Sequence, residues 1–255
     1  MIRIFGVQLR KELRESWRTR KVIIVLAVLI LFGLASPILA KITPDLLKSM
    51  GENQMQGITI TIPVPTEKDA VIQFVKNTTQ FGLLLAVLMT FGAVVGEKEH
   101  GQAALMFPHP LPREVFVLAK FTAQAILFGL AVLLSGLGAY LYTVLLFKAP
   151  DIGGFAALLA LIYLWLLCLV ALSLLASTLG QSMTSAGGLA FVFVLVILLA
   201  GMFTNLAPGK LLNWGQDLAT SATSPARWSA LAVTLAISAL AVSASCFALQ
   251  RQEIG

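Results

Sequence analysis

Six uncharged apolar runs constrain the fold of this chain most strongly. They cover residues 22–40, 77–96, 121–147, 155–179, 186–206 and 229–249. Each is long enough for a helix to cross a hydrocarbon core of about 30 Å. Only 12% of the 255 residues are charged, against about a quarter in a soluble domain. The sequence therefore predicts an all-α polytopic membrane protein: a cytoplasmic helix over 1–21, then a six-span domain over 22–255.

The first run competes with a signal peptide. The apolar region of a signal peptide is normally about 7–15 residues long and is followed by a small-x-small cleavage site. The run over 22–40 is longer, and Ile38 stands where a small residue is needed. We therefore interpret this run as the first transmembrane helix.

Residues 1–21 predict an amphipathic interfacial helix. Phe5, Leu9, Leu13 and Trp17 recur at i+4, which places them on one helical stripe. A basic helix with an apolar stripe is typical of helices that lie on a membrane. The alternative is an ordinary solvated helix that only supplies charge for topology.

Charge predicts the orientation. Six spans place both termini on one side, and seven of the eighteen basic residues precede residue 22. Basic residues favour the cytoplasmic side, and this assignment puts eleven of them inside and seven outside. The net charge of +6 therefore indicates membrane topology and not a nucleic-acid partner.

The segments between the other spans carry weaker signals. Residues 58–65 alternate and then meet prolines, which predicts an extended segment. Thr66, with Asp69 three residues later, predicts the N-cap of a helix that continues into the second span. Residues 207–228 have an apolar side and either re-enter the membrane or lie on it. The pair Gly92 and Gly96 forms a GxxxG motif, which we interpret as helix packing.

The sequence offers no catalytic, metal or cofactor site. No predicted span contains Asp, Glu, Lys, Arg or His, which disfavours an ion-coupled transporter. No P-loop motif occurs, so ATP hydrolysis would belong to another chain. His100 and His109 lie next to prolines and are interpreted as surface residues, whereas Cys168 and Cys246 lie in apolar runs and are interpreted as small core residues.

Uncharged polar residues within or beside the runs predict hydrogen bonds between helices. They are Asn77, Thr78, Thr79, Gln80, Thr90, Gln124, Ser135, Ser173, Ser177, Thr178 and Asn205.

The charged segment over 97–120 predicts a cytoplasmic docking surface. Glycines at 96 and 101 can end or bend the second helix, and residues 102–107 can form a short helix that Pro108 ends. Met106 and Phe107 would offer adaptable apolar contacts to a partner. The alternative is a plain loop, stiffened by prolines, whose charges are only solvated.

This segment, GEKEHGQAALMFPHPLPREVFVLAK, resembles a loop of ABC-2 type transporter permeases. Those proteins carry an E-[KR]-E-x-G-T run, a short helix, a P-x-x-R turn and a Lys that enters the third helix. The matching positions here are Glu97, Lys98, Glu99, Gly101, Pro110, Arg113 and Lys120. Two departures are Gln102, where the family has Thr, and Pro112, where it has Ser. The run KELRESWRTRK at 11–21 resembles the family's N-terminal helix.

The resemblance implies a permease that pairs with a second or similar copy and binds two cytosolic ATPase subunits, which would hold ATP and Mg. Glu97, Lys98, Glu99, Gly101, Gln102, Met106, Phe107, Pro110, Arg113 and Lys120 would then couple the ATPases to the spans. Family members mostly export, and one branch supports maturation of a copper enzyme, nitrous oxide reductase. Three alternatives stay open: a permease for maturation of a cofactor or metal centre, a scaffold or sensor that anchors a cytosolic protein, and a channel.

Overall fold

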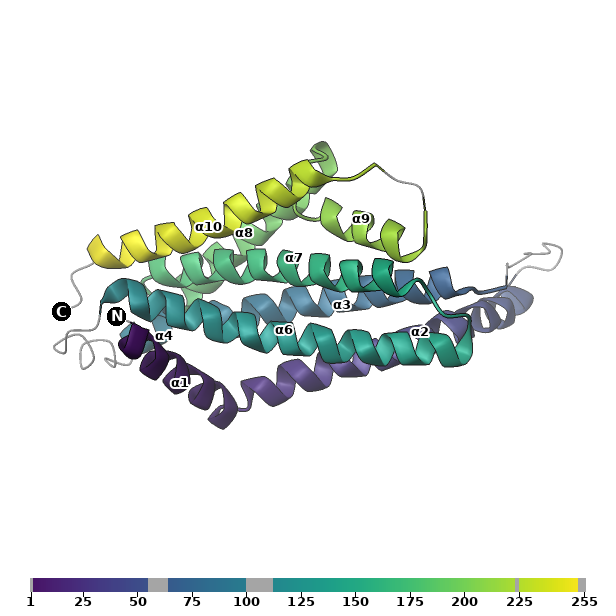
Figure 1. Ribbon diagram of the computed structural model, residues 1–255, viewed down its shortest axis with the longest axis horizontal. Helices are drawn as coiled ribbons and strands as arrows, with labels where there is room; N and C mark the ends of the chain where they lie inside the picture. The colour runs from purple at the N-terminus through teal and green to yellow at the C-terminus, as the bar shows by residue number, and fades with distance from the viewer. Residues whose placement is uncertain (1, 55–63, 100–111, 223–224, 252–255) are drawn as a thin grey trace.

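The computed structural model describes residues 2–54, 64–99, 112–222 and 225–251. The regular structure of these residues is entirely helical and forms an elongated bundle (Figure 1). The helices are α1 (Ile2–Arg18), α2 (Lys21–Gln54), α3 (Glu67–Thr90), α4 (Val95–Glu99), α6 (Arg113–Leu146), α7 (Ile152–Leu179), α8 (Met183–Phe203), α9 (Lys210–Ala219) and α10 (Trp228–Arg251).

Six of the described segments are long and apolar enough to cross a membrane, as predicted. They correspond to α2, α3 with α4, α6, α7, α8 and α10. The last three predicted spans agree with the helices to within three residues at each end. Capping places the starts of two of these helices slightly before the uncharged runs: the Asp151 carboxylate accepts the Gly154 N–H at the start of α7, and the Ser182 hydroxyl accepts the Ser185 N–H at the start of α8.

The predicted end of the first span at residue 40 is wrong. Helix α2 continues to Gln54 and contains Pro37 and Pro44. A proline removes one backbone hydrogen bond from a helix, but neighbouring helices can stabilise a helix across this defect. Helix α2 packs extensively against α3 and α6. The segment after residue 40 was interpreted as polar because Lys41, Asp45 and Lys48 interrupt the apolar run, although it stays helical.

The second span begins as predicted and ends differently. Asp69 accepts the backbone N–H of Thr66 at 2.8 Å, and α3 runs from Glu67 into the apolar segment. The helix then stops at Thr90, and a turn over 91–94 precedes the five-residue α4. The uncharged run over 77–96 is therefore not one helix. Extended residues predicted at 58–65 lie mostly outside the described residues.

The third span corrects the predicted loop over 97–120. Helix α6 begins at Arg113, eight residues before the uncharged run, so Lys120 lies inside a helix. The prediction that the spans lack ionisable residues is therefore wrong, because it defined each span by its uncharged residues. A lysine whose charge is paired can remain inside an otherwise apolar helix.

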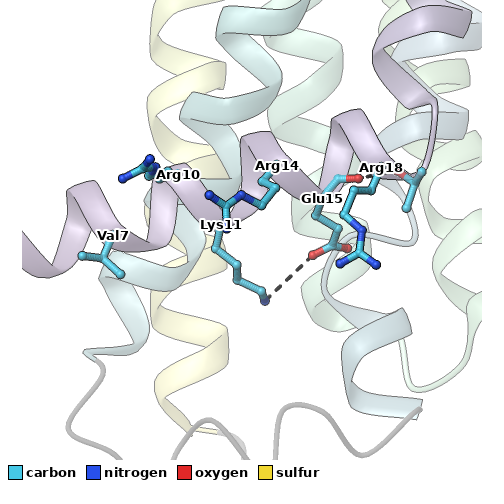
Figure 2. A pocket seen from close by; sticks show the side chains of 7 residues that line it. Val7, Arg10, Lys11, Arg14, Glu15 and Arg18 are labelled. Carbon is cyan, nitrogen blue, oxygen red and sulfur yellow. Dashed lines mark hydrogen bonds and ion pairs between the residues drawn. The ribbon is translucent and has the colours of Figure 1, made fainter.

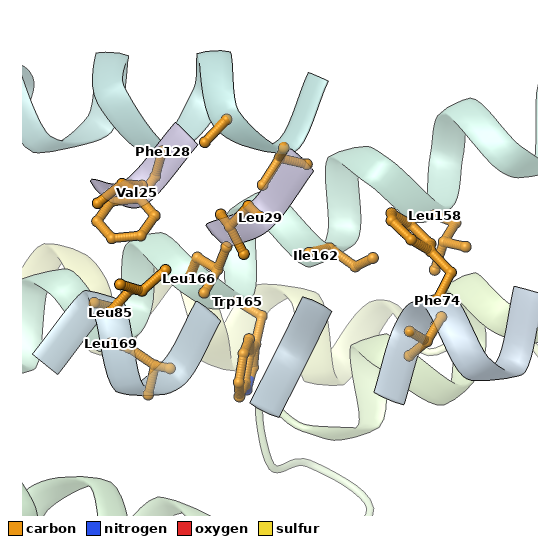
Figure 3. Close-up of a cluster of buried hydrophobic side chains, with 14 of the residues drawn as sticks. Val25, Leu29, Phe74, Leu85, Phe128, Leu158, Ile162, Trp165, Leu166 and Leu169 are labelled. Atoms are coloured by element: carbon orange, nitrogen blue, oxygen red, sulfur yellow. The ribbon is translucent and has the colours of Figure 1, made fainter. Parts of the chain in front are cut away.

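Helix α7 lies at the centre of the bundle. Of its most apolar window, 61% of the residues are buried, against 22% in α8 and in α10. The largest buried cluster joins α7 to α2, α3 and α6, with Leu29, Phe74, Phe128 and Trp165 among its members (Figure 3). Both Cys168 and Cys246 are free thiols, and Cys168 lies in this central helix. The interpretation as a core residue is confirmed for Cys168, which is buried, whereas Cys246 is only half-buried.

The predicted apolar side of the segment over 207–228 is confirmed as helix α9. Its buried residues include Leu211 and Trp214, and it packs against α7. It lies at the opposite end of the bundle from α1, α4 and the two chain termini (Figure 1). The end with α1 and α4 is therefore the one that the charge pattern predicts to be cytoplasmic.

Candidate functional site

The short helix α4 contacts three different parts of the bundle through three consecutive charged residues. Glu97 contacts Lys120 of α6 and Lys11 of α1. Lys98 Nζ donates to the Thr178 carbonyl at 2.8 Å, near the end of α7. A Glu99 oxygen accepts the backbone N–H of Met183 at 2.9 Å, at the start of α8. These residues match the family-like E-K-E motif identified in the sequence.

The signs of these charges suit the helix ends that they contact. The C-terminus of a helix carries partial negative charge and its N-terminus partial positive charge. Lys98 lies at the C-terminal end of α7, and Glu99 lies at the N-terminal end of α8. Each contact therefore combines a hydrogen bond with a favourable interaction between the charge and the helix dipole.

A serine of α7 completes the attachment of α4. The Ser177 hydroxyl accepts the backbone N–H groups of Val94 at 2.9 Å and Val95 at 3.1 Å. These groups lie where the second span is interrupted, so their partners in a continuous helix are lost. Ser177 satisfies both, and the turn over 91–94 is thereby fixed to α7.

Lys120 is the centre of a buried ion cluster. Its side chain is 4% exposed, and its Nζ lies 3.0 Å from Glu12 Oε2 and 2.8 Å from Glu97 Oε1. It also lies 4.8 Å from the centre of the Phe116 ring. A buried ammonium group is stabilised only by close opposite charges and hydrogen bonds, and Glu12 and Glu97 supply them.

Glu12 reaches this cluster from the polar side of α1. Gln8 donates to Glu12 Oε1 at 3.1 Å, and these two residues are the most buried described side chains of α1. Burial raises the pKa of Glu12, and Glu97 raises it further, whereas Lys120 and Lys11 oppose the shift. The cluster therefore joins α1, α4 and α6 through charges that have little access to water.

The carboxylates of Glu12, Glu15 and Glu97 come within 4.8 Å of one another. The ammonium group of Lys11 contacts all three, and that of Lys120 contacts Glu12 and Glu97. Two cations are thus already present among the acids. We therefore interpret the group as an ion-pair network between helices, not as a metal centre.

A cavity of about 230 Å³ adjoins the ion cluster between α1, the 91–94 turn and α6. It is lined by Glu97, Lys120 and Gln124 among other residues. Glu97 Oε2 and Gln124 Oε1 are buried and have no hydrogen-bond donor in the described part of the chain. Space and unsatisfied acceptors occur together here, which is suitable for bound water.

The structure places the other predicted coupling residues in two groups. Arg113 donates to the carbonyl groups of Leu249 at 2.9 Å and Gln250 at 2.8 Å, which ties the start of α6 to the end of α10. Gly101, Gln102, Met106, Phe107 and Pro110 lie outside the described residues, as do His100 and His109.

Sequence reasoning missed the inward face of α1. The predicted stripe is only half-buried at Phe5, Leu9 and Leu13, and Trp17 is 65% exposed. The buried face instead carries Gln8 and Glu12. Gln8 and Glu12 lie four residues apart on a basic helix, which indicated that they share one face. The partner of Glu12 could not be predicted, because Lys120 is 108 residues away.

The polar residues predicted to link helices do so in several cases. Asn77 donates to Ser36, Gln124 donates to the Met89 carbonyl, and Ser135 donates to the Leu29 carbonyl. Thr79 and Thr178 donate to carbonyl groups of their own helices instead. The GxxxG glycines pack as predicted, because both Gly92 and Gly96 face Met183 of α8.

Comparison with known proteins gives consistent matches. The sequence model described as "ABC-2 family transporter protein" matches residues 8–220. The "Uncharacterized transmembrane protein YxlG" of Bacillus subtilis is 26% identical over 186 residues, covering 72% of this chain and 71% of that protein. The "Probable ABC transporter permease protein NosY" of Stutzerimonas stutzeri is 36% identical over 70 residues, covering 28% of this chain and 25% of that protein.

Proposed function

Because the chain belongs to the ABC-2 family of transporter proteins, we propose that it is an export permease driven by two cytosolic ATPase subunits. As a family member it is a transmembrane component of an ABC transporter and associates with an ABC ATPase. The finer proposal is that it pairs with a second copy or a similar permease in the cytoplasmic membrane. Both termini would then face the cytoplasm, and the substrate would leave through a path between the paired bundles.

The arrangement around α4 is the observation that carries this proposal. Residues 100–111 connect α4 directly to α6 in the sequence, and they contain Gly101 and Pro110 of the motif that resembles the family's coupling loop. A force applied to this segment acts on α4 and α6 first. Glu97, Lys98 and Glu99 then connect α4 to α1, α6, α7 and α8 by charged contacts.

Such contacts suit the transmission of movement. The charged groups at Glu97 and Lys120 are buried, so separating them would leave unpaired charges in an apolar environment. Bundle helices joined in this way move together more readily than they separate. When the ATPase subunits close on ATP, the movement would therefore be transmitted to α1 as well as to the spans next to the loop.

The proposal is tested by purifying the full-length chain together with its ATPase from native membranes. We expect the complex to contain two ATPase subunits with either two copies of this chain or one copy and a similar permease, and we expect the ATPase to hydrolyse ATP. Substitution of Glu97, Gly101 or Met106 by bulky or oppositely charged residues should weaken the link between hydrolysis and transport without preventing membrane insertion.

Two results would contradict the proposal. If the folded chain is recovered without any ATPase, the scaffold alternative is favoured. If all such variants hydrolyse ATP and transport as the wild type does, the loop and α4 do not couple the two chains. The short match to NosY does not favour the enzyme-maturation alternative, because it covers only 25% of that protein.

A further inference from the structure

Helix α1 has a third face that the ion cluster does not use. Arg10, Arg14 and Arg18 lie four residues apart and follow one side of the helix. They line a groove of about 710 Å³ (Figure 2), together with Val7, Lys11, Glu15 and Thr19.

The charges of α1 are segregated between its faces. Glu12 contacts Lys120, and Glu15 contacts Lys11. None of the three arginines lies within 4.0 Å of a carboxylate in the described part of the chain. The acids are thus engaged by lysines, and the guanidinium groups stay available to an external anion.

Exposed apolar side chains lie close to the arginines. Val7 is 68% exposed, Trp17 is 65% exposed and Ile4 is 39% exposed. A water-soluble helix rarely presents a tryptophan in this way, whereas tryptophan is enriched where a membrane meets water. This combination of arginine and apolar side chains is typical of a helix that lies among lipid headgroups.

We propose that Arg10, Arg14 and Arg18 bind the phosphate groups of anionic phospholipids. A guanidinium group can donate two parallel hydrogen bonds to a phosphate. Adjacent arginines are about 6 Å apart along the helix axis, so they can engage different headgroups. Binding would hold α1 at the membrane surface while its opposite face keeps Glu12 against Lys120.

This inference goes beyond the proposed function, because it concerns a lipid and not the ATPase. Its test uses the purified full-length chain in mixed micelles of phosphatidylglycerol and phosphatidylcholine, with retained lipid measured by native mass spectrometry. One variant carries Arg10→Gln, Arg14→Gln and Arg18→Gln. The control carries Lys68→Gln, Lys148→Gln and Lys210→Gln, which removes three charges at the other end of the bundle.

We expect the wild type and the control to retain phosphatidylglycerol in preference to phosphatidylcholine. The arginine variant should lose this preference, by roughly fivefold for each arginine at low salt. Added inorganic phosphate should not displace the lipid, since the apolar residues of α1 contribute to lipid binding. Thermal unfolding of each variant shows whether the bundle is intact.

Three results would overturn the inference. The arginine variant could keep the full preference, the lysine control could lose it equally, or inorganic phosphate could displace the lipid. If the arginine variant keeps its lipid preference but loses the ATPase, the groove is a contact with a protein and not with lipid. Retention of the ATPase is measured separately, so failure of the lipid site can be distinguished from failure of the proposed function.

Discussion

At the scale of single residues, Lys120 determines how α1, α4 and α6 meet. It lies inside a helix whose neighbouring residues are apolar, and its ammonium group contacts two carboxylates from different elements. Its family-like position could be recognised in the sequence, whereas its burial could not. The uncharged run begins only after Lys120, but the helix begins seven residues before this lysine. The helix can include Lys120 because the fold brings Glu12 and Glu97 close to its ammonium group.

Replacement of Lys120 by methionine should strongly destabilise the protein. Glu12 and Glu97 would stay buried without their main cation, and breaking a buried pair typically costs about 3–5 kcal/mol. Thermal unfolding in detergent, followed by tryptophan fluorescence, measures the effect. Lys76→Met is the matched control, because Lys76 is an exposed lysine on α3. Equal melting temperatures for Lys120→Met and the wild type would contradict the cluster's structural role.

The raised pKa of Glu12 predicts a pH dependence with a definite sign. Burial is the main cause of the shift, so the folded state holds the Glu12 proton more tightly than the unfolded state does. Its contribution to stability is then full below its ordinary pKa of 4.5 and is lost as the pH rises through the folded pKa. As the pH rises through this range, the unfolding free energy of the wild type should fall relative to that of Glu12→Gln. A shift towards the wild type would show that Lys120 and Lys11 outweigh burial.

At the scale of elements, the interruption of the second span is the feature that best connects sequence to site. Gly92 lies in the turn and packs against Met183, and Ser177 accepts the two N–H groups that the turn releases. The glycines could be found in the sequence, and Ser177 was one of many polar candidates. Their pairing could not be predicted, since Val94 and Ser177 are 83 residues apart.

Replacement of Ser177 by alanine should loosen the attachment of α4. Two buried N–H groups would lose their acceptor, and each unsatisfied group typically costs about 1–3 kcal/mol. Hydrogen exchange at the Val94 and Val95 amides should become faster. Ser173→Ala is the control, because Ser173 is also buried in α7 but its hydroxyl has no hydrogen-bond partner in the described structure. Unchanged exchange in Ser177→Ala, or equal acceleration in both variants, would contradict this account.

The contact between α7 and α9 makes a separate prediction. A side chain at Gly154 would collide with the backbone carbonyl of Leu218 in α9, and backbone cannot move aside as a flexible side chain can. Gly154→Ala should therefore lower the unfolding free energy by about 1–3 kcal/mol, as overpacking usually does. Gly188→Ala in α8 is the control, because nothing lies within 4 Å of the added carbon there. If both substitutions have the same effect on thermal unfolding, α9 does not pack as described.

Element ends show where sequence reasoning succeeds and why it fails elsewhere. Thr66 with Asp69 predicted the start of α3, because a capping interaction is local and visible in four residues. The continuation of α2 beyond residue 40 was missed, since Lys41, Pro44 and Asp45 end the uncharged run there although the helix continues. The inward face of α1 was missed for the same reason, because a polar side chain indicates solvent until its buried partner is known.

At the scale of the whole molecule, the charged contacts are concentrated at one end of the bundle. This end contains α1, α4, the start of α6 and the end of α10 (Figure 1). The six-span layout and this arrangement followed from hydrophobic runs and basic residues alone. The contacts that would transmit movement could not be predicted from the sequence, because they join charged residues that lie far apart in the chain.

The central claim is that the ion cluster transmits movement from the loop after α4 to α1. Hydrogen exchange of the reconstituted transporter, with and without ATP trapped on the ATPase, tests it most directly. We predict that trapped ATP changes exchange in α4, α6 and α1 of the wild type and of Lys76→Met. In Lys120→Met, the change should persist in α4 and weaken in α1, where the contact between Lys11 and Glu97 remains. A response of α1 that is as strong in Lys120→Met as in the wild type, or its absence from the wild type when α4 responds, would contradict the account.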